Sequence, residues 1–323
     1  MKEGSQRLLE PEWLPSSLWP AAEMAMRLPQ AIVRIYRDTL VQAGLMELAH
    51  QRDDKNPPVG GLNQKDTDLH FAQQFDGSMA RAQLVLLDPH GELGPSSDML
   101  IKNLSGGRLV LVDIPCGAGA ISCSFLSNIA QLREDGVLPR LPLHVTIVGG
   151  ELSDPARAYA AQLLDELTPK LKRQAIAVKT AFRSWDVLDR ISNTDLIREI
   201  LRREKEAGRV LVAIANFSSF LQKESKFKEA QPQLDELMRY CSGGKGVTFW
   251  IEPATNVATS KGGLLSRIWT NIVNRLRDIA PRGSGPARDG AYLSQSRYFR
   301  AVAEDEKVRT TVALLPTQLK GRE

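Results

Sequence analysis

The stretch RLVLVDIPCGAG, residues 108–119, decides the fold of this chain. It begins as a nearly continuous apolar run rich in Leu and Val, which is typical of a strand buried on both faces of a sheet. After Asp113 and Ile114 the residues become small, and glycine lets the backbone approach a ligand closely. The N-terminus of a following helix would add free N–H groups. The stretch therefore predicts a buried strand that ends in a ligand-binding loop.

Apolar runs of the same kind recur toward the C-terminus, and helical patterns lie between the early ones. The runs are LHVTIVG (143–149), AIAVKTAF (175–182), RVLVAIANF (209–217) and GVTFWIE (246–252). Residues 155–167 and 195–208 carry helical patterns. Buried strands that alternate with helices indicate a parallel sheet built of βαβ units.

Two further runs, RYFRAVAE (297–304) and RTTVALL (309–315), are separated only by residues 305–308. A parallel crossover needs about a dozen residues or more, so this spacing favours an antiparallel hairpin. The expected fold class is α/β, with a doubly wound, mostly parallel, seven-stranded sheet that closes in a terminal antiparallel hairpin.

The N-terminal part of the chain has a different pattern. Apolar residues at helical spacing run through residues 32–49 and 69–88, and polar segments rich in Pro and Gly separate them. We therefore expect two regions: a helical region over residues 1–100 that caps the substrate pocket, and the sheet domain over residues 101–323.

The composition excludes several classes of protein. Hydrophobic residues make up 42% and charged residues 25%, as in ordinary globular domains. The net charge of +4 is too small to indicate nucleic-acid binding by itself. Three cysteines without zinc-ligand spacing indicate a reducing compartment and no metal site. No signal peptide and no apolar stretch of about 18 residues is visible, so we expect a cytoplasmic protein without membrane contact.

In an open α/β sheet, ligands bind beyond the carboxyl ends of the strands. Four strand ends carry suitable residues, in the segments DIPCGAG (113–119), GGE (149–151), WDV (185–187) and NF (216–217). A carboxylate such as Glu151 can accept hydrogen bonds from both hydroxyls of a ribose. Asp186 can accept from an adenine amino group while Trp185 or Val187 packs on the ring. The four ends together predict a nucleoside-containing ligand.

This ordered set of strand ends resembles the class I, Rossmann-like methyltransferases that depend on S-adenosyl-L-methionine. The resemblance covers roughly residues 100–323. The first loop of that family reads D-x-G-x-G-x-G. Gly117 and Gly119 match its second and third glycines, whereas Pro115 stands at the first glycine position.

The resemblance implies S-adenosyl-L-methionine as cofactor and a methyltransferase as function, with the acceptor and any catalytic residue unknown. Gly117 and Gly119 would border the methionine part, Glu151 would bind the ribose and Asp186 the adenine, and Asn216 and Phe217 would lie near the methyl group. The implied cofactor-binding residues are Asp113, Pro115, Cys116, Gly117, Gly119, Glu151, Trp185, Asp186, Val187, Asn216 and Phe217. In many relatives the helix before the first strand closes over the cofactor, which makes Phe71, Phe75 and Arg81 candidates here.

Three alternatives stay open. The motif from Asp113 to Cys116 also looks like the D-x-P-C motif of RNA cytosine-5 methyltransferases, in which Cys116 would be the nucleophile. A nicotinamide-dependent oxidoreductase is disfavoured because Ser122 breaks the G-x-G-x-x-G pattern and because of the hairpin. A catalytically inactive binding or assembly protein of the same fold stays open because Pro115 departs from the first glycine of the family's loop.

One segment bears on the acceptor. Residues 260–290 carry six basic and two acidic side chains beside an apolar helical stripe. Such a surface can bind phosphates, so RNA or DNA is a possible partner through this segment. An ordinary amphipathic surface helix is the alternative interpretation.

Overall fold

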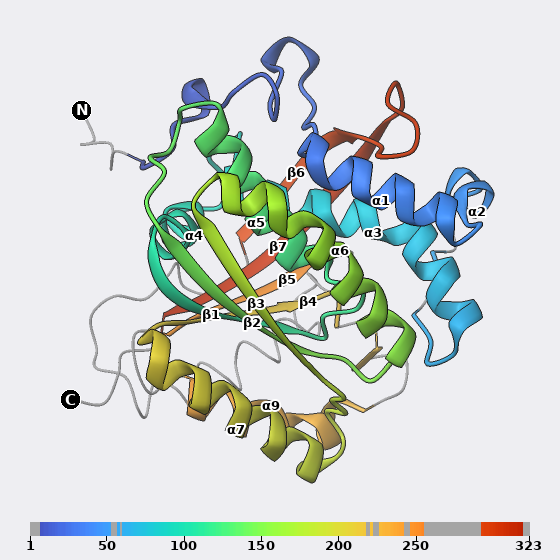
Figure 1. Cartoon of the computed structure of the whole chain (residues 1–323), viewed down its shortest axis with the longest axis vertical. Coiled ribbons are helices and arrows are strands. Elements are labelled where there is room, and N and C mark those ends of the chain that lie inside the picture. Colours follow the sequence, from blue (N-terminus) through green and yellow to red (C-terminus); the bar gives the residue numbers. More distant parts are fainter. Residues whose placement is uncertain are drawn as a thin grey trace.

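The computed structural model describes residues 7–52, 57–58, 60–217, 220–221, 226–241, 246–254 and 292–318. In this part of the chain, one mixed sheet is covered by helices on both faces (Figure 1). The strands are β1 (Gly107–Ile114), β2 (Leu143–Gly150), β3 (Ile176–Arg183), β4 (Val210–Ala215), β5 (Val247–Glu252), β6 (Tyr292–Phe299) and β7 (Lys307–Gln318).

The strand order across the sheet is β3-β2-β1-β4-β5-β7-β6. All neighbouring pairs from β3 to β5 are parallel, and β7 runs antiparallel to both β5 and β6. The predicted α/β class and the mostly parallel seven-stranded sheet are therefore confirmed. The part from β3 to β5 has the strand order of a Rossmann-like sheet, whose direction of winding reverses between β1 and β4.

The terminal hairpin differs in detail from the prediction. We expected its first strand over residues 297–304, but β6 begins at Tyr292 and ends at Phe299. The chain then leaves the sheet, and Arg300, Ala301 and Val302 are buried. Arg300 donates to the Ala49 carbonyl, and the Ala301 N–H donates to the Asp76 carboxylate, both of which lie in N-terminal helices. Ala301 and Val302 thus belong to a buried connection. An apolar run in the sequence does not distinguish such a connection from a strand.

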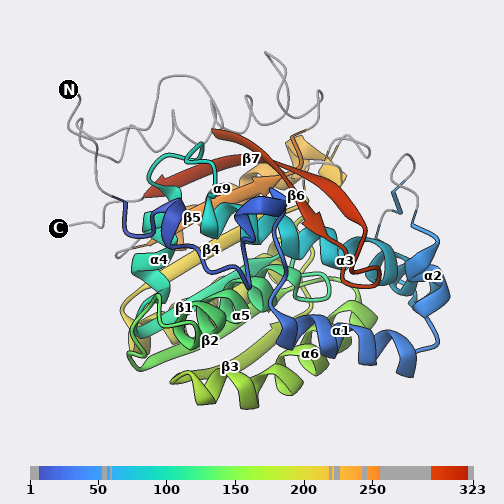
Figure 2. The ribbon, with the colours of Figure 1, turned by 90° about the horizontal axis from the view of Figure 1, so that it is seen from above.

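Helices form a layer on each face of the sheet. The described helices of at least one α-turn are α1 (Gln30–Gln42), α2 (Met46–His50), α3 (Gln64–Leu87), α4 (Ser96–Leu104), α5 (Ala120–Glu134), α6 (Asp154–Arg173), α7 (Arg190–Ala207) and α9 (Phe227–Cys241). Residues of α1, α3, α4, α5 and α6 share one buried cluster, and residues of α7 and α9 share the other. Figure 2 shows α1, α5 and α6 together on the first of these faces.

Alternation along β1 divides the core between the two faces. Leu109 and Leu111 belong to the cluster under α5 and α6, whereas Val110 and Val112 belong to the cluster under α7 and α9. Successive side chains of a strand point to opposite faces, so a strand that is covered on both sides must be apolar at every position. This is why the uninterrupted run from 109 to 112 folds as the buried central part of β1.

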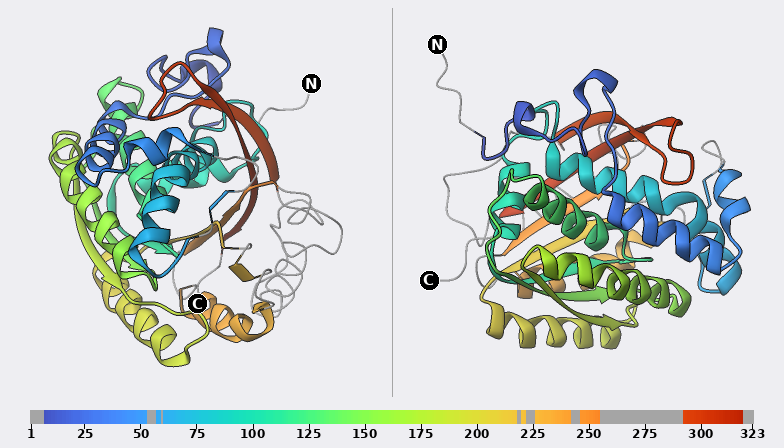
Figure 3. Two further views of the ribbon diagram at one scale, coloured as in Figure 1. Left: turned by 90° about the vertical axis from the view of Figure 1, so that its right-hand side faces the viewer. Right: turned by 45° about the horizontal axis from the view of Figure 1, so that its top comes forward.

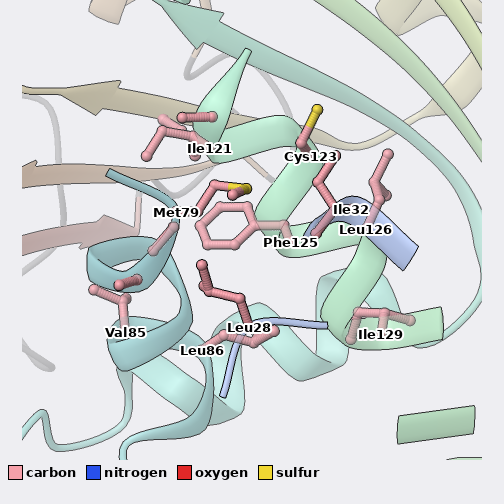
Figure 4. Close-up of a cluster of buried hydrophobic side chains, with 14 of the residues drawn as sticks. Leu28, Ile32, Met79, Val85, Leu86, Ile121, Cys123, Phe125, Leu126 and Ile129 are labelled. Atoms are coloured by element: carbon pink, nitrogen blue, oxygen red, sulfur yellow. The ribbon is translucent and has the colours of Figure 1, made fainter. Parts of the chain in front are cut away.

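The N-terminal helices share the core of the sheet. In Figure 4, Met79 of α3 lies against Phe125 of α5, and Leu86 of α3 lies beside Leu28. Cys123 of α5 is fully buried in the same cluster. Each such side chain contributes roughly 1.5–3 kcal/mol through removal of its surface from water. This packing fixes α3 next to the loop that precedes α5.

Candidate functional site

The buried carboxylate of Asp113, near the end of β1, holds the β1–α5 loop. Its Oδ2 accepts hydrogen bonds from the Ser122 hydroxyl at 2.7 Å and from the Ser122 backbone N–H at 3.2 Å. Asp113 is fully buried, and burial raises its pKa to about 7. Among the described residues its Oδ1 has no hydrogen-bond partner. Asp113 therefore ties the end of β1 to the first turn of α5.

Glu151 joins the loops that follow β1 and β2. Its Oε2 accepts a hydrogen bond from the Gly117 backbone N–H at 3.1 Å, and its Oε1 accepts from the Ser153 backbone N–H at 2.9 Å. The Ser153 hydroxyl in turn caps α6 by accepting from the Ala156 N–H. Each carboxylate oxygen keeps a second lone pair, so Glu151 can still accept from hydroxyl groups of a ligand. The structure thus brings together Gly117 and Glu151, which the sequence predicted for one site.

The two glycines of the loop have different requirements. Gly117 has φ +50°, and a Cβ placed there would meet no atom of the described residues within 4 Å. Gly119 has φ +80°, and its Cβ would lie 3.1 Å from the Cβ of Ala160 on α6. Gly119 is therefore needed for close packing of α5 against α6, whereas Gly117 has open space beside it. Both φ values lie in the left-handed region that favours glycine.

Cys116 is held inside this loop. Its backbone N–H donates to the Gly150 carbonyl at 2.9 Å, and its side chain is only 5% exposed. Burial, with Asp113 and Glu151 nearby, raises the pKa of the Cys116 thiol well above its usual value. A nucleophilic cysteine needs an accessible thiolate. These surroundings favour a structural role for Cys116. The peptide bond between Ile114 and Pro115, just before Cys116, is cis.

The segment after β3 carries one polar side chain, Asp186, between two buried apolar side chains, Trp185 and Val187. Trp185 and Val187 are both 3% exposed, and the Trp185 indole N–H donates to Asn193 Oδ1 at 3.2 Å. Asp186 is half-buried, and its Oδ1 accepts from the Leu188 backbone N–H at 2.9 Å. Trp185 and Val187 therefore form the buried base of this segment, and the Asp186 carboxylate is the group that a ligand can reach.

The β4 end is anchored by a carboxylate that the sequence prediction missed. Glu252, at the end of β5, is fully buried, and its Oε1 accepts from the Phe217 backbone N–H and the Trp250 indole N–H, both at 2.8 Å. Phe217 is 5% exposed and packs on Trp185. Asn216 has φ +56° and presents its side chain toward α3. The signal in the sequence was an acidic residue at the end of a fully buried strand that is otherwise apolar except for Thr248.

Helix α3 crosses the carboxyl ends of the strands. Near its start, the Thr67 hydroxyl lies 3.0 Å from the Ser153 hydroxyl after β2. Further along, Arg81 Nη1 donates to Asn216 Oδ1 at 2.5 Å, and Asn216 Nδ2 donates to Ser78 Oγ at 3.2 Å. Since β1 lies between β2 and β4, α3 passes over the end of β1. The left panel of Figure 3 views the molecule from this side.

The predicted residues of α3 divide between two faces. Phe71 and Phe75 are 1% and 3% exposed and form an aromatic cluster with Tyr36. Arg81 instead faces the β4 end; burial lowers the pKa of its guanidinium, and Glu252 opposes that shift. The helix therefore packs through its aromatic face and presents a polar face to the candidate site.

Two other expectations concern binding partners. The segment 260–290, proposed for RNA or DNA contact, lies outside the described residues. Within the described ranges, no three His, Cys, Asp or Glu side chains are grouped as a metal site would require. No helix in those ranges has the length and apolar character needed to cross a membrane.

No protein-family model matches the sequence, and no curated protein matches it. Among solved structures, the chain is similar to the NADH-dependent reductase A1-R′ in complex with NAD, at 16% identity and a TM-score of 0.27, covering 55% of this chain and 72% of that one. It is similar to loganic acid methyltransferase with SAH, at 11% identity and a TM-score of 0.29, covering 64% and 63%.

A third similar structure is a Methanococcus maripaludis protein provisionally assigned as an S-adenosyl-L-methionine-dependent methyltransferase. It shares 11% identity at a TM-score of 0.28, covering 78% of this chain and 96% of that one. TM-scores this low do not discriminate between a reductase and a methyltransferase. The function must therefore be inferred from the residues of this chain.

Proposed function

We propose that this protein is an S-adenosyl-L-methionine-dependent methyltransferase whose cofactor lies across the carboxyl ends of β3, β2, β1 and β4. The observation that carries the proposal is the carboxylate of Glu151, which is fixed by backbone N–H groups of both adjoining loops at the switch point of the sheet. An accepting carboxylate in that place is suited to a ribose diol.

The other residues of the site fit the same ligand. Asp186 holds one backbone N–H through Oδ1, which leaves Oδ2 to accept from an adenine amino group. Gly117 has open space on its Cα side, as a loop that is approached by a ligand requires. Asp113 and Cys116 are buried and support this loop from within rather than offering side chains to the ligand.

The cofactor, when bound, supplies an electrophilic methyl group on a sulfonium. The protein's part is positioning, which accounts for much of the rate in a transfer between two bound reactants. Glu151 and Asp186 would hold the nucleoside, and Asn216 and Phe217 would shape the side on which the acceptor enters. Helix α3 covers this region and limits access of water. A general base is not required of these residues.

One feature of the sheet supports a methyltransferase over a nicotinamide-dependent oxidoreductase. The antiparallel β7 lies between β5 and β6, which is the hairpin that the resemblance implies. The RNA cytosine-5 alternative needs a reactive Cys116, and burial of that thiol opposes it. A binding protein without catalysis would keep the same ligand contacts but transfer no methyl group.

The proposal is tested by incubating the protein with methyl-labelled S-adenosyl-L-methionine and a cell extract. The extract is then separated into RNA, DNA, protein and small molecules. Label in one fraction, absent with the Glu151→Gln variant, supports transfer and identifies the class of acceptor. Cofactor binding without label in any fraction would instead support the inactive binding protein.

A further inference from the structure

Helix α3 carries a polar stripe along the face that it turns toward the strand ends. Thr67, Gln74, Ser78 and Arg81 are spaced by seven, four and three residues. Such spacing places side chains on one helix face, because positions three, four and seven apart lie above one another. The contacts of Thr67, Ser78 and Arg81 show that this face meets the loops after β2 and β4.

Gln74 occupies the middle of this stripe. Thr67 is fixed at the β2 end by Ser153, and Ser78 is fixed at the β4 end by Asn216. Because β1 lies between β2 and β4, Gln74 lies on the part of this face that crosses the end of β1. The loop there contains Gly117, where an added Cβ would meet no atom within 4 Å in the part of the chain that the structure describes.

The side-chain amide nitrogen of Gln74 is a buried hydrogen-bond donor, and a buried donor is expected to have an acceptor. This atom, Nε2, has no hydrogen-bond partner among the described residues. Its neighbour Gln73, by contrast, donates from Nε2 to the backbone carbonyls of Leu48 and Gln51. A buried donor without a partner costs about 1–3 kcal/mol, so its retention calls for a compensating function.

We infer that Gln74 is a ligand-binding residue that recognises the α-amino-acid end of the cofactor. This inference rests on the proposed function and adds to it a residue of α3 that was not among the predicted site residues. A primary amide offers one acceptor and two donor N–H groups, and an α-amino acid offers an ammonium and a carboxylate. The amide of Gln74 matches both groups, and a hydrogen bond to a charged group is stronger than one between neutral groups.

Two related nucleosides separate this contact from the rest of the site. S-adenosylhomocysteine carries the amino-acid end, whereas 5′-methylthioadenosine has the same adenosine and a thioether sulfur but no amino acid. Isothermal titration calorimetry of the full chain measures both affinities without any methyl acceptor. Gln74→Ala should weaken S-adenosylhomocysteine binding by about tenfold or more and leave 5′-methylthioadenosine binding unchanged.

Gln73→Ala is the matched control because it removes a glutamine from the adjacent position, whose amide donates to the backbone carbonyls of Leu48 and Gln51. It should lower the melting temperature without changing either affinity. Equal affinities of Gln74→Ala and wild type for both nucleosides would overturn the role of Gln74 and leave the proposed function intact. An equal loss for both nucleosides would also overturn it, since the effect would not depend on the amino acid. Failure of the wild type to bind either nucleoside would overturn the proposed function itself.

Discussion

Arg81 of α3 donates a hydrogen bond of 2.5 Å to the side-chain oxygen of Asn216, which follows β4. The amide nitrogen of Asn216 donates to Ser78 on the same helix, so α3 holds both ends of this amide. The residue lies at the place where the proposed methyl acceptor would enter. The contact therefore links the helix that covers the site to the strand end that shapes it.

This link predicts an energetic coupling between Arg81 and Asn216. In a double-mutant cycle, Arg81→Met and Asn216→Ala should show a coupling of about 1 kcal/mol in the free energy of unfolding by urea. The exposed pair Arg198 and Asp195 is the control, with side chains 75% and 62% exposed. Its coupling should be no more than a few tenths of a kcal/mol. Additive effects at Arg81 and Asn216 would show that α3 is not fixed by this contact.

A second prediction concerns the close approach at Gly119. Gly119→Ala should destabilise the fold by about 2–3 kcal/mol, because the new Cβ combines a left-handed φ with a contact of 3.1 Å to Ala160. Gly136→Ala isolates the effect of φ, since Gly136 has φ +75° and open space around its Cβ position. Urea unfolding should give the Gly119 variant the larger loss. Equal losses would mean that α5 and α6 can separate at no cost.

The buried Asp113 predicts a pH-dependent stability. Burial raises its pKa from the ordinary 3.8 to about 7, so the folded state binds a proton more tightly than the unfolded state. This contribution to stability is fully present below about pH 4 and is lost as the pH rises to about 7.

The Asp113→Asn variant tests this directly because asparagine cannot ionise and still accepts from Ser122. Its free energy of unfolding relative to wild type should increase between about pH 4 and pH 7, by about 4 kcal/mol at most. A difference that stays constant over this range would show that Asp113 titrates as an ordinary carboxyl group.

The buried thiol of Cys116 predicts that catalysis does not depend on it. Cys116→Ser should retain methyl transfer to the labelled fraction within about threefold of wild type, because a raised pKa keeps the thiol protonated and unreactive. Cys241→Ser controls for removing a buried cysteine elsewhere in the core. Complete loss of transfer with Cys116→Ser alone, in a folded protein that still binds the cofactor, would restore the cysteine-nucleophile alternative.

The buried strands could be predicted well from the sequence. The runs at 108–114, 143–149 and 246–252 agree with β1, β2 and β5 within one residue at each end. A strand covered on both faces is apolar at most of its positions, so its pattern is distinct. Residues 301–303 are apolar for another reason: Ala301 and Val302 belong to the core cluster that the N-terminal helices share, and Arg300 Nε lies 3.8 Å from Asp76 Oδ2 of α3.

The residues of the candidate site that follow strand ends could be predicted from the sequence. Gln74, which α3 contributes to the site, could not. Gly117 and Glu151 are brought together by strand order, which the sequence indicates. Gln74 was missed because periodicity shows which residues share a helix face but not what the face meets. Glu252 was missed because an acidic residue after a strand is usually solvated, and only the packing of Phe217 and Trp250 around it shows otherwise.

The most direct test of the proposed function is calorimetric titration of the protein with S-adenosyl-L-methionine. Wild type should bind one cofactor per chain, and Glu151→Gln should bind about tenfold or more weakly, because an amide cannot accept from both the Gly117 and Ser153 N–H groups and a ribose. Glu166→Gln, on the surface of α6, should bind as wild type does. No binding by wild type at millimolar cofactor, or equal binding by wild type and Glu151→Gln, would contradict the placement of the cofactor at this site.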